Sequence, residues 1–191
     1  MPAPSALYFD LGSPYAYLTF ARAARVLGAR PPLVPIVLGP VFEHRGHGSW
    51  SLTDTRAENM AEVERRALAY GLPPMAWPDP WPYNTLHAMR MATWAATQER
   101  GAEFAAAAYR ATFAAGADLR DHAVLARCAE EAGLPGADVG AIVADQAIKD
   151  ALREATDAAI AAGVVGVPTI VVDGKLFFGD DRLEAVAQAA G

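Results

Sequence analysis

Ser13 is the first side chain whose type and position could do chemistry. It follows an apolar run that ends at Leu11 and precedes Pro14, which suits the first turn of a helix because its missing N–H is not needed there. Residues 8–18 therefore predict a strand, a tight turn and a helix whose N-cap is Ser13. A hydroxyl beside unpaired backbone N–H groups, at the positive end of a helix, can hold an anion or a thiolate. The alternative is a serine that only caps its helix.

Metal and disulfide chemistry have little support. Cys128 is the only cysteine, which excludes an intramolecular disulfide and a cysteine-based metal cluster. Its type predicts a small buried side chain in a helix. His44 and His47 are three residues apart, but no neighbouring cysteine or carboxylate pattern completes a site. We therefore expect no metal.

Composition narrows the class of protein. The chain has 191 residues, of which 53% are hydrophobic and 20% charged, with a formal net charge of −6, so it can build a core. The basic residues are scattered without the aromatic-plus-basic patterns of nucleic-acid readers, which argues against such a partner. No apolar run approaches the ~20 residues of a membrane span, and no signal segment precedes the first strand. We expect a soluble cytoplasmic protein with no membrane partner.

The elements that would position Ser13 come from both ends of the chain. After the first helix, residues 33–38 predict a second strand, parallel to the first and at a sheet edge because Pro35 lacks a ladder donor. Near the other end, residues 164–173 predict a strand that begins with a Val-Pro bend. Asp173-Gly174 is a strong hairpin signal, residues 175–178 return as an antiparallel strand, and a helix over 183–190 ends the chain.

The middle of the chain is almost entirely helical, after a stretch at 39–55 that is predicted to be a loop able to wall a ligand pocket. Asn84 and Thr85 cap a long helix, and residues 77–83 form a rigid Pro-rich aromatic linker. The other predicted helices cover 56–70, 102–115, 121–132 and 138–162, the last as one helix or two. We therefore expect a discontinuous domain over 1–40 and 160–191, and an all-helical insertion domain, preceded by a loop, over 41–159.

This layout, a βαβ unit and a later ββα unit, resembles the thioredoxin fold. Ser13 stands where that fold has the first cysteine of its Cys-x-x-Cys motif, and Pro168 matches its cis-proline. With no thiol at either motif position, disulfide exchange is excluded. The Phe-Asp-x-x-Ser-Pro-Tyr, Gly-Val-Pro-Thr and Phe-Gly-x-Asp-Arg-Leu stretches are more specific. In this order they resemble the DsbA-related kappa-class glutathione transferases and the 2-hydroxychromene-2-carboxylate isomerases, over essentially the whole chain.

The resemblance implies glutathione as cofactor and gives roles to particular residues. Ser13 would hydrogen-bond the glutathione sulfur, which together with the helix N-terminus favours the thiolate. The backbone of Val167, before Pro168, would pair with the cysteinyl backbone. Asp180 and Asp181 would receive the γ-glutamyl end, although both could merely cap the last helix.

The remaining site residues are less defined. Relatives hold the glycine carboxylate with a lysine and an asparagine, but this chain has no lysine before Lys149, so the substitutes are Arg56, Arg45 and His47. The expected substrate pocket has four residues: Tyr15, Asn84, Trp81 and Phe42. For Asn84 a helix cap is the simpler role. Trp81 and the neighbouring Trp77 and Tyr83 could equally pack domains together.

By resemblance, the chain is a homodimeric, glutathione-dependent isomerase of aromatic catabolism. It would interconvert 2-hydroxychromene-2-carboxylate and trans-o-hydroxybenzylidenepyruvate, a small aromatic substrate, by reversible thiolate addition. One alternative is a kappa-like glutathione transferase that conjugates hydrophobic electrophiles. A second is a non-catalytic, glutathione-binding thioredoxin-like module.

Overall fold

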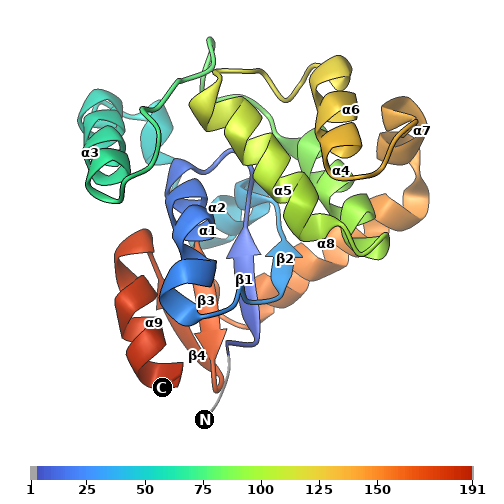
Figure 1. Cartoon of the computed structure of the whole chain (residues 1–191). Coiled ribbons are helices and arrows are strands. Elements are labelled where there is room, and N and C mark those ends of the chain that lie inside the picture. The colour runs from blue at the N-terminus through green and yellow to red at the C-terminus, as the bar shows by residue number, and fades with distance from the viewer. Residues whose placement is uncertain (1–3, 191) are drawn as a thin grey trace.

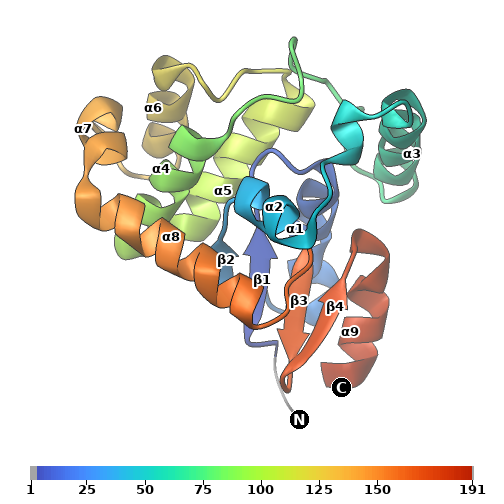
Figure 2. The same cartoon turned by 180° about the vertical axis from the view of Figure 1, so that it is seen from behind.

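The computed structural model describes residues 4–190. Figures 1 and 2 show a four-stranded sheet with helices on both faces and a group of helices beyond one end of it. In chain order the elements are β1 (Ala6–Phe9), α1 (Pro14–Leu27), β2 (Leu33–Pro35), α2 (Leu38–Arg45), η1 (Trp50–Leu52), α3 (Arg56–Ala69), α4 (Leu86–Thr97), α5 (Gly101–Tyr109), the π-helical turn η2 (Arg110–Ala114), α6 (His122–Glu131), α7 (Val139–Ala144), α8 (Gln146–Ala161), β3 (Thr169–Val172), β4 (Lys175–Phe178), η3 (Asp180–Arg182) and α9 (Leu183–Ala190). No helix in this range is long and apolar enough to cross a membrane.

The sheet joins the two ends of the chain, as the sequence predicts. Its strand order is β2-β1-β3-β4. β1 pairs with β2 in parallel and with β3 antiparallel, and β4 completes an antiparallel hairpin with β3. β2 lies at an edge of the sheet, where a proline is tolerated although Pro35 has no backbone N–H to donate to a neighbouring strand.

Two expectations between 33 and 55 are wrong. The second strand ends at Pro35, because the Val37 N–H turns away to donate to Thr156 Oγ1 (3.1 Å) and α2 begins at the next residue. The expected loop holds a helix, α2, and a 3₁₀ turn, η1. Pro40 falls in the first turn of α2, where no N–H is needed, and Gly46 ends the helix with φ 70°.

Helices cover both faces of the sheet. α1 and α9 pack together on one face, in front of the strands in Figure 1. α8 packs on β2 and against α2 on the opposite face, in front of the strands in Figure 2. Because α8 runs unbroken through residues 159–160, the sheet and the helical insertion share an element, and the expected division into domains stays a prediction.

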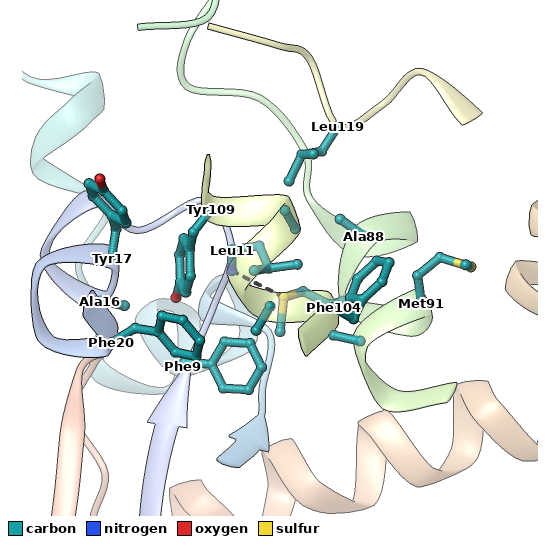
Figure 3. Close-up of a cluster of buried hydrophobic side chains, with 14 of the residues drawn as sticks. Phe9, Leu11, Ala16, Tyr17, Phe20, Ala88, Met91, Phe104, Tyr109 and Leu119 are labelled. Carbon is teal, nitrogen blue, oxygen red and sulfur yellow. Dashed lines mark hydrogen bonds between the residues drawn. The ribbon is translucent and has the colours of Figure 1, made fainter. Parts of the chain in front are cut away.

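The main core lies where the carboxyl end of β1 meets the inserted helices. Figure 3 shows Phe9 and Leu11 beside Tyr109 and Phe104 of α5 and Phe20 of α1. The first four of these residues are at most 2% exposed. Burying side chains of this size stabilises each by about 1.5–3 kcal/mol. The turn that carries Ser13 therefore follows directly on a well-packed core, to which β1, α1 and the inserted helix α5 all contribute.

Cys128 of α6 gives a direct test of this packing. Burial raises the pKa of its thiol to about 11, and the residue is 2% exposed. Since only the thiolate reacts, we expect the native protein to resist Ellman's reagent at pH 8 and to release one equivalent of product after denaturation. Rapid reaction in the native state would contradict the placement of α6.

Candidate functional site

Ser13 begins α1, as the sequence predicts. Its backbone is extended (φ −92°, ψ 114°), and its Oγ accepts a hydrogen bond from Ala16 N at 3.2 Å. The hydroxyl also donates to the Val167 carbonyl, but at 3.5 Å, well beyond the usual O–H···O distance. The hydroxyl proton is therefore weakly held and can be given to a ligand. The bond between Val167 and Pro168 is cis.

A cavity of about 580 Å³ opens beside Ser13. Six residues named from the sequence line it: Ser13, Tyr15, Phe42, Trp81, Asn84 and Val167. Much of the wall is aromatic, since the Trp50 ring lies 5.5 Å from that of Trp81 and 5.9 Å, edge-on, from that of Tyr15. Asn84 Oδ1 accepts from Leu86 N at 2.8 Å, so its amide also caps α4.

A second cavity, of about 320 Å³, adjoins the first, and Tyr15, Val167 and Phe178 line both. Its other lining residues are Arg66, Pro168, Gly179, Asp180, Asp181 and Arg182. We call this smaller cavity the charged groove. It contains both aspartates expected at the γ-glutamyl end.

The two aspartates are not equivalent. Asp180 is 2% exposed, and its carboxylate accepts hydrogen bonds from Arg66 Nη1 (2.6 Å) and Tyr70 Oη (3.0 Å). Burial raises the pKa of Asp180, while Arg66 and Tyr70 act in the opposite direction. The side chain of Asp181 is 56% exposed, with Arg182 Nε 3.8 Å away. Asp181 is thus the carboxylate more open to a ligand.

The cations expected at the glycine carboxylate lie outside both cavities. Arg56 is exposed and directs its guanidinium at the carbonyl of Trp81. His47 is exposed, contacts the Phe42 ring, and its Nδ1 lies 3.1 Å from the Gly48 carbonyl. Arg45 ends α2 and is exposed as well. Both cavities are lined without these three residues.

Sequence reasoning missed Asp10, which ties the site together. Asp10 is 3% exposed, and its Oδ1 accepts from Gly12 N (2.8 Å) and Thr85 Oγ1 (2.9 Å). Its Oδ2 accepts from Leu38 N at 3.1 Å, and its backbone carbonyl from Ser13 N at 3.0 Å. Burial raises the pKa of Asp10, and these three side-chain hydrogen bonds oppose the rise. One carboxylate thus fixes the serine turn to the first turns of α2 and α4.

Arg66 was missed too. It projects from α3, with Nε 2.6 Å from Glu62 Oε1 and its Cζ 5.6 Å from the centre of the Tyr15 ring. The pKa of Arg66 is raised: burial lowers it, but the carboxylates of Glu62 and Asp180 outweigh burial, so the side chain stays charged. In the sequence Arg66 is one of several charged residues on a predicted amphipathic helix, and nothing there marks it as a site residue.

The sheet, the serine at the N-cap of α1 and the facing Val-Pro turn define a thioredoxin-like fold of the DsbA type. The family model described as a DSBA-like thioredoxin domain matches residues 6–191. The chain is 30% identical to the 2-hydroxychromene-2-carboxylate isomerase of Sphingobium xenophagum, over 93% of this chain and 92% of that protein. It is 25% identical to glutathione S-transferase kappa 1 of Rattus norvegicus, over 100% and 92%.

Solved structures agree on the fold. A 2-hydroxychromene-2-carboxylate isomerase structure matches with a TM-score of 0.85 at 24% identity, over 96% of this chain and 92% of that one. The cytosolic disulfide reductase DsbM from Pseudomonas aeruginosa with GSH matches with a TM-score of 0.62 at 16% identity, over 97% and 94%. The chain belongs to the DsbA-like thioredoxin family, in the group of 2-hydroxychromene-2-carboxylate isomerases and kappa-class glutathione transferases.

Proposed function

We propose that this protein is a glutathione-dependent isomerase that interconverts 2-hydroxychromene-2-carboxylate and trans-o-hydroxybenzylidenepyruvate. The observation that carries the proposal is the position of Ser13, a weakly engaged hydroxyl at a helix N-terminus in an aromatic cavity that adjoins a charged groove. The relative named for this reaction supports it at 30% identity over nearly the whole chain.

Glutathione fits the residues that face the two cavities. When bound, it supplies a thiol nucleophile whose reversible addition to a conjugated double bond permits the rotation that isomerisation requires. Ser13 donates its hydroxyl hydrogen to the sulfur and keeps it in the anionic form. Val167 offers its backbone, whose carbonyl takes part, within residues 4–190, only in the long hydrogen bond with Ser13. The charged groove receives the γ-glutamyl group.

The protein's own residues then position the substrate. Trp50 and Trp81 stack on an aromatic ring, since offset and edge-on aromatic contacts each stabilise by about 0.5–1.5 kcal/mol. Tyr15 directs its hydroxyl to Asn59 Oδ1 (3.3 Å), which holds its ring between the two cavities. The apolar wall limits the access of water to the sulfur.

Two measurements in sequence test this function. Glutathione is titrated while tryptophan fluorescence is followed, and we expect saturable quenching at millimolar concentrations or below. The chromene is then assayed with and without glutathione, and we expect turnover only with it. No binding at millimolar glutathione would exclude any glutathione-dependent enzyme, and binding without turnover would favour a non-catalytic module.

A kappa-like glutathione transferase is the second candidate, and the wall of the larger cavity favours it. The ionisable side chains of that wall are Asp10, Tyr15 and Tyr83, and burial raises the pKa of all three. Among the described residues that line this cavity there is no arginine, lysine or histidine to pair with a substrate carboxylate, whereas an uncharged electrophile needs no such partner. Conjugation of a chlorinated nitrobenzene at a higher kcat/KM than chromene isomerisation would select this candidate.

Trp50 allows the substrate cavity to be tested separately from the glutathione site. We expect Trp50→Ala to raise the KM for the aromatic substrate about tenfold, because an aromatic contact and its buried area are lost. The Kd for glutathione should stay within about twofold, since the ring faces the larger cavity alone. Trp50→Phe is the matched control and should keep most of the affinity. An unchanged KM in Trp50→Ala would move the substrate elsewhere.

A further inference from the structure

We propose that Arg66 is the residue that binds the α-carboxylate of the γ-glutamyl group, and that Asp180 positions it rather than contacting the ligand. This assignment rests on the proposed use of glutathione. It changes the role expected of Asp180, whose carboxylate is buried and already accepts hydrogen bonds from Arg66 and Tyr70.

The guanidinium of Arg66 is held from two sides and open on a third. Glu62 binds Nε and Asp180 binds Nη1, which fixes the plane of the group. Within residues 4–190, Nη2 takes part in no hydrogen bond, and the side chain, 26% exposed, lines the charged groove. A guanidinium fixed in this way loses little further freedom when a carboxylate binds, and hydrogen bonds between charged groups are stronger than those between neutral ones.

The charges of the groove suit an amino-acid zwitterion. Arg66 and Arg182 are positive, and Asp180 and Asp181 are negative. Arg66 pairs with Asp180 and Glu62 through Nη1 and Nε, so the α-carboxylate is left the Nη2 edge of its guanidinium, and the exposed carboxylate of Asp181 is available to the α-ammonium group. A simple anion would gain only the first contact.

Arg66 lies close to Tyr15, a residue that lines both the charged groove and the cavity of Ser13. Its Cζ lies 5.6 Å from the centre of the Tyr15 ring, and Tyr15 follows Ser13 by two residues in the first turn of α1. One end of the charged groove therefore lies next to the proposed sulfur position, and the γ-glutamyl group extends away from it toward α3.

Arg66→Met tests the assignment by calorimetry with two thiols. Cysteinylglycine lacks the γ-glutamyl group, so comparing its Kd with that of glutathione isolates the contribution of the charged groove to binding. We expect the Kd for glutathione to rise about 30-fold and that for cysteinylglycine to stay within about twofold. Glutathione amidated at the α-carboxylate should bind wild type and Arg66→Met alike. Arg65→Met is the matched control, because Arg65 is a neighbouring exposed arginine that contacts Glu62 and lies outside the groove.

Arg66→Met leaves Asp180 buried without its cation, so the double variant Arg66→Met/Asp180→Asn separates binding from folding. We expect it to melt near the wild-type temperature and still bind glutathione weakly. Wild-type affinity in the folded double variant, or an equal loss for both thiols, would overturn the role of Arg66 and leave the proposed function standing. Failure of the wild-type protein to bind glutathione would overturn both.

Discussion

Replacing Ser13 with glycine is expected to lower kcat/KM for the glutathione-dependent reaction about 100-fold. The variant loses the hydroxyl that is proposed to donate to the sulfur, and a hydrogen bond to an anion stabilises by about 1.5–3 kcal/mol. Glycine is the informative substitution because it caps helices almost as well as serine, so α1 should begin where it does now. Steady-state rates at saturating glutathione, with thermal melting in parallel, measure the effect.

Ser13→Ala and Ser13→Thr complete the series. Alanine also removes the cap that Ala16 N now uses, so it should cost about 1 kcal/mol of unfolding free energy beyond the loss of activity. Threonine keeps a hydroxyl and should retain much of the activity. If the glycine variant keeps wild-type kcat/KM, the sulfur is held by another group and the central role of Ser13 is wrong.

Asp10→Ala is expected to have the largest effect on stability, lowering the free energy of unfolding by about 3 kcal/mol. The substitution leaves Gly12 N, Leu38 N and Thr85 Oγ1 without their acceptor, and each buried unsatisfied group costs about 1–3 kcal/mol less any relaxation or entry of water. Urea unfolding followed by circular dichroism measures it. Because the serine turn, α2 and α4 lose their common anchor, kcat should fall in the same variant.

Thr85→Val is the control for Asp10. It removes one of the three partners and should cost about 1 kcal/mol. The double variant should be no less stable than Asp10→Ala, because the hydroxyl has lost its acceptor already. Additive costs, or a cost for Asp10→Ala no larger than that of Thr85→Val, would show that the carboxylate does not connect these elements.

Much of the fold follows from local patterns. The Gly-Ser-Pro turn, the Val-Pro bend and the Asp-Gly hairpin signal lie at the ends of β1, β3 and α1, where each has a specific backbone role. α2 could not be predicted in this way. The sequence predicts a loop over 39–55, and the hydrogen bond from Leu38 N, at the first residue of α2, goes to Asp10, 28 residues earlier in the chain.

Part of the site could be predicted from the sequence and part could not. Ser13, Val167 and Pro168 could be placed together because strand pairing brings the two ends of the chain side by side. The ion pair between Arg66 and Asp180 joins residues 114 apart in the sequence, and no local sequence pattern around either residue predicts the contact. The sequence therefore led to Arg56, which the structure places at the carbonyl of Trp81, outside both cavities.

The ionisation of bound glutathione shows whether Ser13 stabilises the thiolate. The absorbance of the thiolate near 240 nm is recorded for the wild-type complex as pH is varied, and again for Ser13→Gly. We expect the pKa of the bound thiol to lie about 1–2 units below the reference value of about 8.5 in the wild-type protein, and to return toward that value in Ser13→Gly. A bound thiol that titrates at the reference pKa in the wild-type protein would contradict this role of Ser13.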